Sequence, residues 1–409
     1  MVTLSDIIAR PDGLGGAGRE RVLRCVRGCM DEFGHAADAP AVLAVAPGRV
    51  ELCGNHTDHQ RGRVLCAAAG PDMLACAVPN GLGRVRVCSE GFARAEICLP
   101  AGAPVAAERA TSAALLRGVA AGYATRGFDA YVASDIPPGG GLSSSAAFEL
   151  LLAVLCERFS PEGGALTALE RAERCRRAEN EYFGKPCGLL DQAAIALGGV
   201  QELDFAAGCA AARVDFDFGR CGHRMCVVDT RSAHADLTAD YAAIADECRA
   251  VAAHFGAETL REVDEGAFYG AIPELRRSLG DRAVLRAMHV FAENARAGRA
   301  AGALRRGDFA AFLREVDASG RSSAELLQNL WPGRDAREQP LTLALALARG
   351  VLGGAGACRV HGGGFGGTML AFVPEGLYGE FSRRMEAVFG PGSCLALSVR
   401  SAGAGVIEI

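Results

Sequence analysis

A glycine- and serine-rich stretch between a strand-like segment and an apolar helix constrains the fold of this chain more than any other feature. Residues 137–149 read Pro-Pro-Gly-Gly-Gly-Leu-Ser-Ser-Ser-Ala-Ala-Phe-Glu, after a strand-like run at 131–136 and before an apolar run at 146–159 that predicts a helix. The glycines let backbone N–H groups surround an anion, and the start of a helix favours phosphate. The three hydroxyls suit phosphate oxygens or a magnesium ion. A flexible surface loop with a serine N-cap is the alternative interpretation.

The length and composition are typical of a globular protein with a sizeable core. With 409 residues we expect two or three domains. The net charge of −5 gives no electrostatic reason to expect nucleic acid or a membrane surface as a partner. The N-terminal residues show no basic region followed by an apolar run, and no apolar stretch reaches the roughly 18 residues of a membrane span. We therefore expect a cytoplasmic protein.

The cysteines and the lysine narrow the possible chemistry. The 16 cysteines stand singly in apolar segments and form no C-x-x-C pair, which predicts buried reduced thiols. Lys185 is the only lysine, and no Gly-Lys-Ser/Thr sequence of a Walker A loop is present. If the chain binds a nucleotide, backbone amides, arginine and a metal ion must replace that lysine. Schiff-base chemistry is not expected, because Lys185 stands beside Pro186 in a context typical of the surface.

The pattern of apolar residues predicts a mixture of strands and helices. Strands are expected at 41–45, before a turn at Pro47-Gly48, and at 200–205, 213–218, 225–228, 358–360, 369–373 and 396–399, with a hairpin at 84–88 and 95–99. Helices are expected at 111–126, 146–159, 168–183, 239–255 (with Thr238 as N-cap) and 377–389, and over most of 282–350. Because these elements do not alternate regularly, they predict an α+β fold. A domain boundary is expected between 206 and 222, and we set it at 210/211.

A second informative stretch, Pro47 to Leu65, carries a dense set of polar side chains between glycines. These are His56, Thr57, Asp58, His59 and Gln60, and apolar strand-like runs flank them. Mixed donors and acceptors on one loop suit a polyhydroxylated ligand. A polar turn that binds nothing is the alternative. A zinc site is less favoured, because no helix places the histidines on one face.

Two further stretches carry possible metal ligands and a backbone that approaches a ligand closely. Glu179 and Glu181 stand near a helix end, and Asp191 follows a glycine-containing turn, where carboxylates serve as metal ligands or proton acceptors, although each can also be a solvated charge. Residues 361–368 hold five glycines in His-Gly-Gly-Gly-Phe-Gly-Gly-Thr, between two expected strands. Such a run suggests backbone packed tightly against another loop or a ligand, with a plain hairpin as the alternative.

Together these four stretches resemble the superfamily of small-molecule kinases that includes galactokinase, homoserine kinase, mevalonate kinase and phosphomevalonate kinase (the GHMP kinases). The pattern Gly-Arg-Val-x-Leu-x-Gly-x-His-Thr-Asp, here at 48–58, is similar to the galactokinase branch, and the likeness extends from Ala46 to about Val373. It implies a two-lobed α+β GHMP kinase fold. Its N-terminal lobe (1–210), ribosomal-protein-S5-like, would bind ATP and sugar, and its ferredoxin-like C-terminal lobe (211–409) would carry the glycine-rich third motif.

The resemblance also implies roles for individual residues. In galactokinases the aspartate of a Pro-Cys-Gly-x-x-Asp-Gln run, here Asp191, receives the proton of the anomeric hydroxyl, and an arginine matching Arg49 lies beside it and the γ-phosphate. The other matches are sugar contacts (Asn55, His56, Asp58, Gly188 and Tyr241), phosphate contacts (Gly139, Gly140, Gly141, Ser143 and Ser144) and magnesium ligands (Ser145 and Glu179).

The implied activity is that of an ATP- and Mg²⁺-dependent kinase that makes galactose 1-phosphate, with sugar and ATP as its small-molecule partners and a monomeric or weakly homo-oligomeric state. Three positions depart from the family pattern: Asn55 replaces a glutamate that bonds the sugar's O6, His59 replaces a tyrosine, and Ala233 replaces an arginine. If Asn55 faces C6, the lost negative charge makes a C6 carboxylate tolerable. Alternatives are therefore a kinase for galacturonate, N-acetylgalactosamine or arabinose, and a non-catalytic galactose and ATP sensor.

Overall fold

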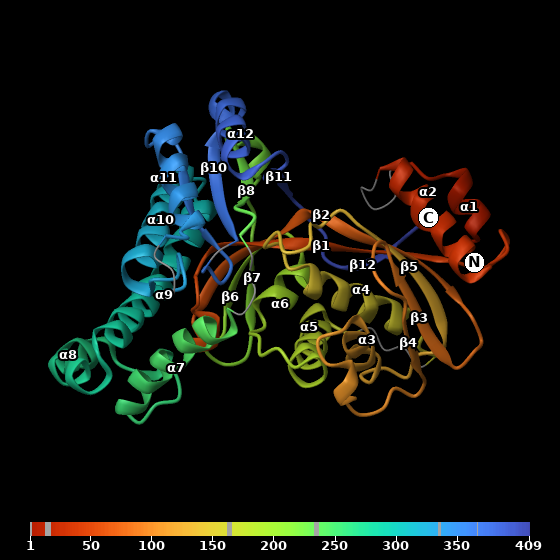
Figure 1. The fold of residues 1–409 in the computed structure, drawn as a ribbon, viewed down its shortest axis with the longest axis horizontal. Coiled ribbons are helices and arrows are strands. Elements are labelled where there is room, and N and C mark those ends of the chain that lie inside the picture. Colours follow the sequence, from red (N-terminus) through yellow and green to blue (C-terminus); the bar gives the residue numbers. More distant parts are fainter. Residues whose placement is uncertain (1, 13–17, 162–165, 233–236, 334–336, 366) are drawn as a thin grey trace.

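One continuous sheet runs through the molecule and organises all of its helices (Figure 1). The computed structural model describes the chain except for residues 1, 13–17, 162–165, 233–236, 334–336 and 366. Over the described residues, 12 strands join in this sheet; its main path is β4-β3-β5-β2-β11-β8-β10-β9, β1 and β6 pair with β2, β12 pairs with β1 and β7 with β6. The strands are β1 Val42–Cys53, β2 Arg63–Pro79, β3 Arg84–Ser89, β4 Ala95–Cys98, β5 Phe128–Ser134, β6 Val200–Asp204, β7 Ala210–Val214, β8 His223–Asp229, β9 Ala357–His361, β10 Thr368–Pro374, β11 Cys394–Val399 and β12 Gly405–Ile407.

The N-terminal half buries both faces of its part of the sheet. Its helices are α1 Leu4–Ala9, α2 Arg19–Phe33, α3 Ser112–Ala120, α4 Ser144–Arg158, α5 Ala168–Arg177 and α6 Leu190–Leu197. Alternate residues of β2 point to opposite faces, so Leu74 and Cys76 pack with α2 whereas Ala75 and Ala77 join the core beneath α4. Helix α4 begins at Ser144, so its first turn directly follows the glycines of the glycine- and serine-rich stretch.

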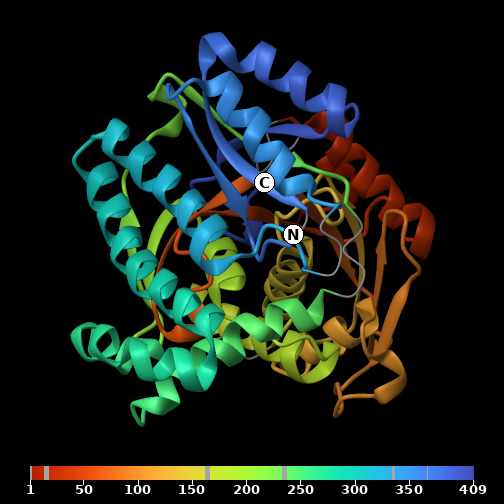
Figure 2. The same cartoon turned by 60° about the vertical axis from the view of Figure 1, so that its left-hand side comes forward.

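The C-terminal half has two groups of helices around β8 to β11. They are α7 Thr238–His254, α8 Glu265–Leu279, α9 Asp281–Arg305, α10 Phe309–Ser322, α11 Pro340–Leu352 and α12 Glu375–Phe389. Helices α11 and α12 cover one face of β9 and β10, while α7, α8 and α9 share a separate apolar cluster. Figures 1 and 2 show α12 (blue) at the far end of this half from α8 (teal). Within the part of the chain that is described, no helix is both long and apolar enough to span a membrane.

Strand β11 connects the two halves of the sheet. Its residues Cys394 to Leu397 pair with β8, whereas Ser398 and Val399 pair with β2. The chain then passes close to α6, where Ala404 N donates to Ile195 O at 2.9 Å. Its last strand, β12, pairs with β1. The residues at the C-terminal end therefore take part in the sheet of the N-terminal half. The division at 210/211 stays a prediction.

Most expected elements are present, and the α+β class is confirmed. The expected turn at Pro47-Gly48 is wrong, because β1 continues through a register shift at this point to Cys53. The strand expected at 213–218 ends at Val214, since Phe216 and Phe218 turn into an aromatic cluster with Phe309. The helix expected at 111–126 ends at Ala120. The N-cap of α7 is Leu237 rather than Thr238.

We predict that Gly403→Ala destabilises the protein because the C-terminal segment passes too close to α6 for a side chain. A β-carbon at Gly403 would collide with the backbone carbonyl of Ala196, whereas one at Gly405 meets nothing within 4 Å. Overpacking of this kind costs about 1–3 kcal/mol. Urea unfolding should therefore show a loss of that size for Gly403→Ala and little change for Gly405→Ala; equal stabilities of the two variants would contradict the tight passage.

Candidate functional site

A buried arginine connects three segments that are far apart in the sequence. The Arg49 side chain, on β1, donates from Nε to Asp191 Oδ1 at 2.6 Å and from Nη2 to Asp191 Oδ2 at 2.8 Å. Its Nη1 donates to the carbonyl oxygen of Gly141, and its backbone N–H donates to Leu142 O at 3.1 Å. A bidentate pair fixes both the distance and the orientation of the carboxylate. Arg49 thus fixes the first turn of α6 and the glycine- and serine-rich loop relative to each other.

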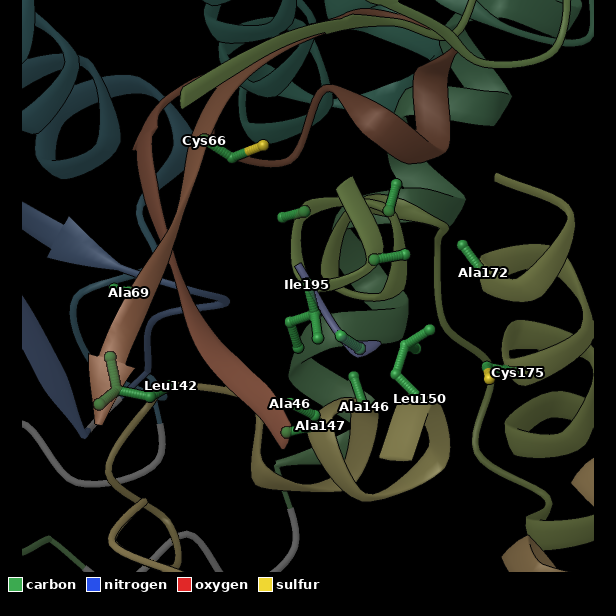
Figure 3. Packing of buried hydrophobic residues seen from close by; sticks show 14 of the residues in the cluster. Ala46, Cys66, Ala69, Leu142, Ala146, Ala147, Leu150, Ala172, Cys175 and Ile195 are labelled. Carbon is green, nitrogen blue, oxygen red and sulfur yellow. The ribbon is translucent and has the colours of Figure 1, made fainter. Parts of the chain in front are cut away.

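The glycine- and serine-rich loop needs its glycines for conformational reasons. Gly139 and Gly141 both have φ +74°, in the left-handed region, and a β-carbon at Gly141 would collide with the Thr368 hydroxyl. Leu142 is buried and anchors the loop in the core. Figure 3 shows Ala46, Ala146, Ala147, Leu150 and Ile195 gathered between β1, α4 and α6. The loop therefore rests on a packed support, and the interpretation as a flexible surface loop does not fit.

Ser143 stands at the N-cap of α4, but its hydroxyl caps nothing. Its φ is 59°, and its Oγ donates to Asp191 Oδ2 instead of accepting from the helix N–H groups. Ser143 does not cap the first N–H groups of α4, and an uncapped helix start is an arrangement that favours an anion. Ser144 and Ser145 form the first turn of this helix. The structure thus brings Ser143, Asp191 and Arg49 together.

The two aspartates of the site have opposite pKa shifts. Burial would raise the pKa of Asp191, but the charge of Arg49 and the hydrogen bonds from Arg49 and Ser143 hold it below its ordinary value. Burial raises the pKa of Asp58 to about 6, and the negative charges of Glu51 and Asp191 add to this shift. Asp191 is therefore ionised throughout the neutral range, whereas Asp58 titrates near its lower edge.

Glu179 lies on a π-helical turn, Ala178–Phe183, that follows α5. Its side chain is 4% exposed, and its Oε1 lies 3.0 Å from Lys185 Nζ and 3.5 Å from Ser145 Oγ. Gln192 Nε2 donates to Glu179 Oε2 at 2.8 Å and to Glu149 Oε2 at 3.1 Å. Burial, and then the charge of Glu179, raise the pKa of Glu149 well above its ordinary value. The buried carboxylates of Glu149 and Glu179 therefore lie close together, next to Ser145.

These residues fit a magnesium ion that arrives with a polyphosphate. A carboxylate and a hydroxyl are hard oxygen donors, and Mg²⁺ usually takes one or two carboxylates together with substrate phosphates. The buried Glu149 Oε1 has no hydrogen-bond partner among the described residues, which is consistent with a pocket short of positive charge. No cluster of three or more His, Cys, Asp or Glu suited to a metal is found within the described ranges. An ion at Ser145 and Glu179 would thus need ligands from the nucleotide.

The polar loop of the second stretch faces the loop that carries Gly188 and Asp191. A β-carbon at Gly188 would collide with Asp58 Oδ2, so only glycine lets the two segments approach this closely. On the other side, His56 Nε2 donates to Gly363 O at 2.9 Å, and the Tyr241 hydroxyl donates to Gly364 O at 3.0 Å. The four candidate sugar contacts are thus grouped around two loops, the one before α6 and the glycine-rich third-motif loop between β9 and β10. They are His56, Asp58, Gly188 and Tyr241.

Hydrogen bonds fix the tautomers of the histidine pair. Because Gly363 O can only accept, His56 donates from Nε2, and its Nδ1 then accepts from His59 Nε2 at 3.2 Å. His59 Nδ1 in turn accepts from Gln60 Nε2 at 3.2 Å. Burial lowers the pKa of His56 to about 4 and that of His59 to about 3. Both rings are therefore neutral and act as hydrogen-bond relays to the backbone, in place of the alternative zinc interpretation.

Asn55 does not face the site in the way that the sequence suggested. Its side chain is 1% exposed; Nδ2 donates to Glu51 Oε1 and Gly362 O, while Oδ1 accepts from Asn329 Nδ2 at 2.9 Å and from Ser323 Oγ at 3.3 Å. Both protons and both lone pairs are occupied. The amide therefore has no free polar atom for a sugar, and the expectation that its lost negative charge makes a C6 carboxylate tolerable has no support here. Ala233, the other departure in a distant segment, lies outside the described residues.

Several residues that hold the site were missed in the sequence. The Glu293 carboxylate on α9 accepts from the backbone N–H groups of Gly54 and Asn55, at 2.9 and 3.3 Å, and pairs with Arg296. His289 Nε2, one turn earlier, donates to Asn55 O at 2.9 Å. A buried Arg359–Glu51 pair (2.6 Å) joins β9 to β1. The one local signal that could have pointed to them is the spacing of His289 and Glu293, four residues apart on the same face of an apolar helix.

The sequence matches two models of known protein families. Residues 107–199 match the family model for the GHMP kinases N-terminal domain, and residues 30–79 match the galactokinase galactose-binding signature. Galactokinase of Homo sapiens is 32% identical over 93% of this chain and 95% of its own length. Galactokinase of Mycobacterium tuberculosis (strain H37Rv) is 35% identical over 80% of this chain and 88% of its own length.

Solved structures share the fold. Lactococcus lactis galactokinase complexed with galactose aligns with a TM-score of 0.79 at 23% identity, covering 95% of this chain and 99% of that one. A mevalonate kinase aligns with a TM-score of 0.60 at 13% identity, covering 88% of this chain and 99% of that one. The expected GHMP kinase fold is confirmed by this agreement.

We predict that Glu293 is a main support of the 53–55 loop. Glu293→Ala leaves two backbone N–H groups without their acceptor and removes from the buried Arg296 its nearest carboxylate, which should cost about 3–5 kcal/mol of unfolding free energy. Glu380→Ala, which removes an exposed partner of Arg384 on α12, should cost at most about 1 kcal/mol. Urea unfolding at pH 7 measures both.

The loss of unfolding free energy caused by Glu293→Ala should also depend on pH. His289, Arg296 and Arg359 outweigh burial and lower the pKa of Glu293 to about 2. Its contribution is therefore complete above the unfolded value of about 4.3 and falls as pH drops toward 2. A Glu293→Ala cost that matches the Glu380→Ala cost would show that the carboxylate does not hold the loop.

Proposed function

This chain belongs to the galactokinase family, and from that premise we propose that it transfers the γ-phosphoryl group of ATP to the anomeric hydroxyl of galactose. The observation that carries the proposal is the bidentate Arg49–Asp191 pair directly beneath the Gly141–Ser143 turn. It joins a candidate proton acceptor, a cation and a phosphate-binding loop in one contact. A sugar kinase needs these three groups to converge on the reacting oxygen.

Asp191 and Arg49 would have complementary roles in the reaction. Asp191 is ionised at neutral pH, so it can accept a hydrogen bond from the sugar hydroxyl and take its proton as the bond to phosphorus forms. Arg49 holds that carboxylate by its Nε and Nη2 atoms, and its charge offsets the negative charge that develops on the bridging oxygens. Phosphoryl transfer depends mostly on alignment and charge neutralisation, which a buried bidentate pair provides.

The nucleotide would lie along the loop and the start of α4. Backbone N–H groups of Gly139, Gly140 and Gly141, with the hydroxyls of Ser143 and Ser144, would contact the phosphates. Ser145 and Glu179 would hold Mg²⁺, which when bound neutralises charge on the β- and γ-phosphates. The sugar would lie between Asp58 and Gly188 on one side and Tyr241 on the other, with His56 holding the Gly363 carbonyl beside it. No contact of Asn55 favours a uronate, so galactose is the substrate proposed.

We predict that Asp191→Asn abolishes most turnover but leaves sugar binding. A coupled ADP-release assay with galactose, galacturonate, N-acetylgalactosamine and arabinose should give the highest kcat/KM for galactose. Loss of the proton acceptor should lower kcat by about 10²–10⁴-fold, since the amide cannot take a proton. Asp308→Asn, at the N-cap of α10, is the control, because asparagine caps as well as aspartate.

Three results would change this proposal. Undiminished turnover by Asp191→Asn would remove Asp191 from the mechanism. Faster turnover of galacturonate would overturn galactose as the substrate. Galactose and ATP binding without turnover of any sugar by the wild type would favour the sensor.

We predict that sugar affinity falls in mild acid because Asp58 becomes protonated. With its pKa at about 6, the carboxylate is lost as an acceptor of sugar hydroxyls below that pH. The KM for galactose should therefore rise by about tenfold for each pH unit below 6, with a smaller change in the KM for ATP. Asp58→Asn should bind galactose weakly at every pH. A wild-type galactose KM that is flat from pH 7 to 5 would exclude Asp58 as a sugar ligand.

A further inference from the structure

The only lysine of the chain lies at the phosphate end of the site. Lys185 Nζ contacts Glu179 Oε1 at 3.0 Å, and the Ser145 hydroxyl contacts the same oxygen at 3.5 Å. The lysine side chain is 61% exposed, as a surface position predicts, but its ammonium contacts a buried carboxylate. That carboxylate would hold the cation accompanying a nucleotide.

The local backbone explains why this lysine returns to Glu179. The π-helical turn Ala178–Phe183 ends at Gly184, whose φ of 87° reverses the chain. The N–H groups of Gly184 and Lys185 both donate to the carbonyl of Glu179, at 3.0 and 3.1 Å. Asn180 then holds the next segment by accepting from Cys187 N at 2.7 Å. Lys185 is thus tied by its backbone to the residue that its side chain neutralises.

The two partners differ in burial and in the number of contacts that hold them, and this difference suggests an exchange. Glu179 is nearly fully buried, and Gln192 fixes its second oxygen at 2.8 Å. The lysine side chain, by contrast, is largely exposed, and an ammonium offers three donors on a flexible stem. If a divalent cation takes Glu179, the carboxylate can stay in place while the ammonium moves. The closest negative groups would then be the phosphates that accompany the cation.

We propose that Lys185 is a nucleotide-binding residue whose ammonium pairs with Glu179 in the free enzyme and moves to the outer phosphates when the nucleotide binds. The inference rests on the proposed kinase function and assigns to Lys185 the phosphate contact that a Walker A lysine makes elsewhere. The exchange keeps every charge paired: the ammonium neutralises a buried carboxylate before binding and phosphate oxygens afterwards. A fixed counter-ion to Glu179 is the competing explanation.

Selective acetylation tests the exchange directly, because the chain has one lysine. N-hydroxysuccinimidyl acetate can modify Lys185 and the N-terminal amine, and peptide mass spectrometry measures both, with the N-terminal amine as internal reference. A non-hydrolysable ATP analogue with Mg²⁺ should slow acetylation of Lys185 by about tenfold or more. AMP, which lacks the outer phosphates, and galactose alone should have little effect. Equal protection by AMP and the ATP analogue would overturn the proposal.

Binding by three variants separates a phosphate ligand from a counter-ion. Lys185→Met should weaken the affinity for Mg·ATP by about tenfold, as expected for a lost charged hydrogen bond, and leave AMP affinity and the KM for galactose nearly unchanged. Lys185→Arg should restore most of the ATP affinity. Arg177→Met is the matched control, because Arg177 is 69% exposed and pairs with Glu181 at 2.9 Å near the same turn. A Lys185→Met enzyme with altered melting temperature but wild-type ATP affinity would support the fixed counter-ion.

The outcomes also distinguish this inference from the proposed function. Protection of Lys185 by the ATP analogue without turnover of any sugar would support the role of Lys185 in nucleotide binding and contradict the proposed kinase activity. Galactose turnover without protection, and with unchanged ATP affinity in Lys185→Met, would keep the kinase and remove the role of Lys185. If Lys185→Met does not fold, acetylation of the wild-type enzyme still decides between the two explanations.

Discussion

The bidentate contact between Arg49 and Asp191 is the interaction on which the rest of the site depends. It joins β1 to α6, and the same guanidinium holds the Gly141 carbonyl, so one side chain fixes a strand, a helix and a loop relative to one another. A buried guanidinium is tolerated only where its donors are satisfied, and here a carboxylate and a carbonyl meet that condition. The pair thereby serves the fold and the chemistry together, because the geometry that satisfies Arg49 also aims Asp191 at the loop.

The third-motif loop acts mainly through its backbone. The carbonyls of three consecutive glycines, Gly362 to Gly364, accept from the side chains of Asn55, His56 and Tyr241. Side chains at Gly363 and Gly364 would block the approach, since β-carbons there would collide with the Tyr241 ring and with the Asn329 carbonyl. The loop from the C-terminal half thus orients the polar loop of the N-terminal half without supplying side chains of its own. This explains why glycine is required there on grounds of space as much as of conformation.

Local sequence patterns predicted much of the fold and the centre of the site, but not the contacts that support it. Strands, helices and glycine-rich turns follow from apolar periodicity and breakers, so β3, β4 and α4 were placed closely. The resemblance then brought Arg49, Asp191 and Glu179 into one proposal. The role of Glu293 was not foreseen, because its partners lie about 240 residues earlier in the chain and its sequence neighbours look like any buried helix. Asn55 was misread for the same reason, since Asn329 and Gly362, which saturate its amide, are remote in sequence.

Two aspartates in one site acquire different chemistry from their neighbours. Asp191 gains an arginine and a serine hydroxyl, and its pKa falls despite burial; Asp58 gains burial and the negative charges of Glu51 and Asp191, and its pKa rises. Groups separated in this way can divide the work of a reaction. A carboxylate that is always ionised suits a position beside the reacting hydroxyl, because it can accept the proton without first losing one. A carboxylate whose ionisation is costly gains most from ligand hydroxyls that replace the lost water, so its charge is stabilised most when the sugar is bound.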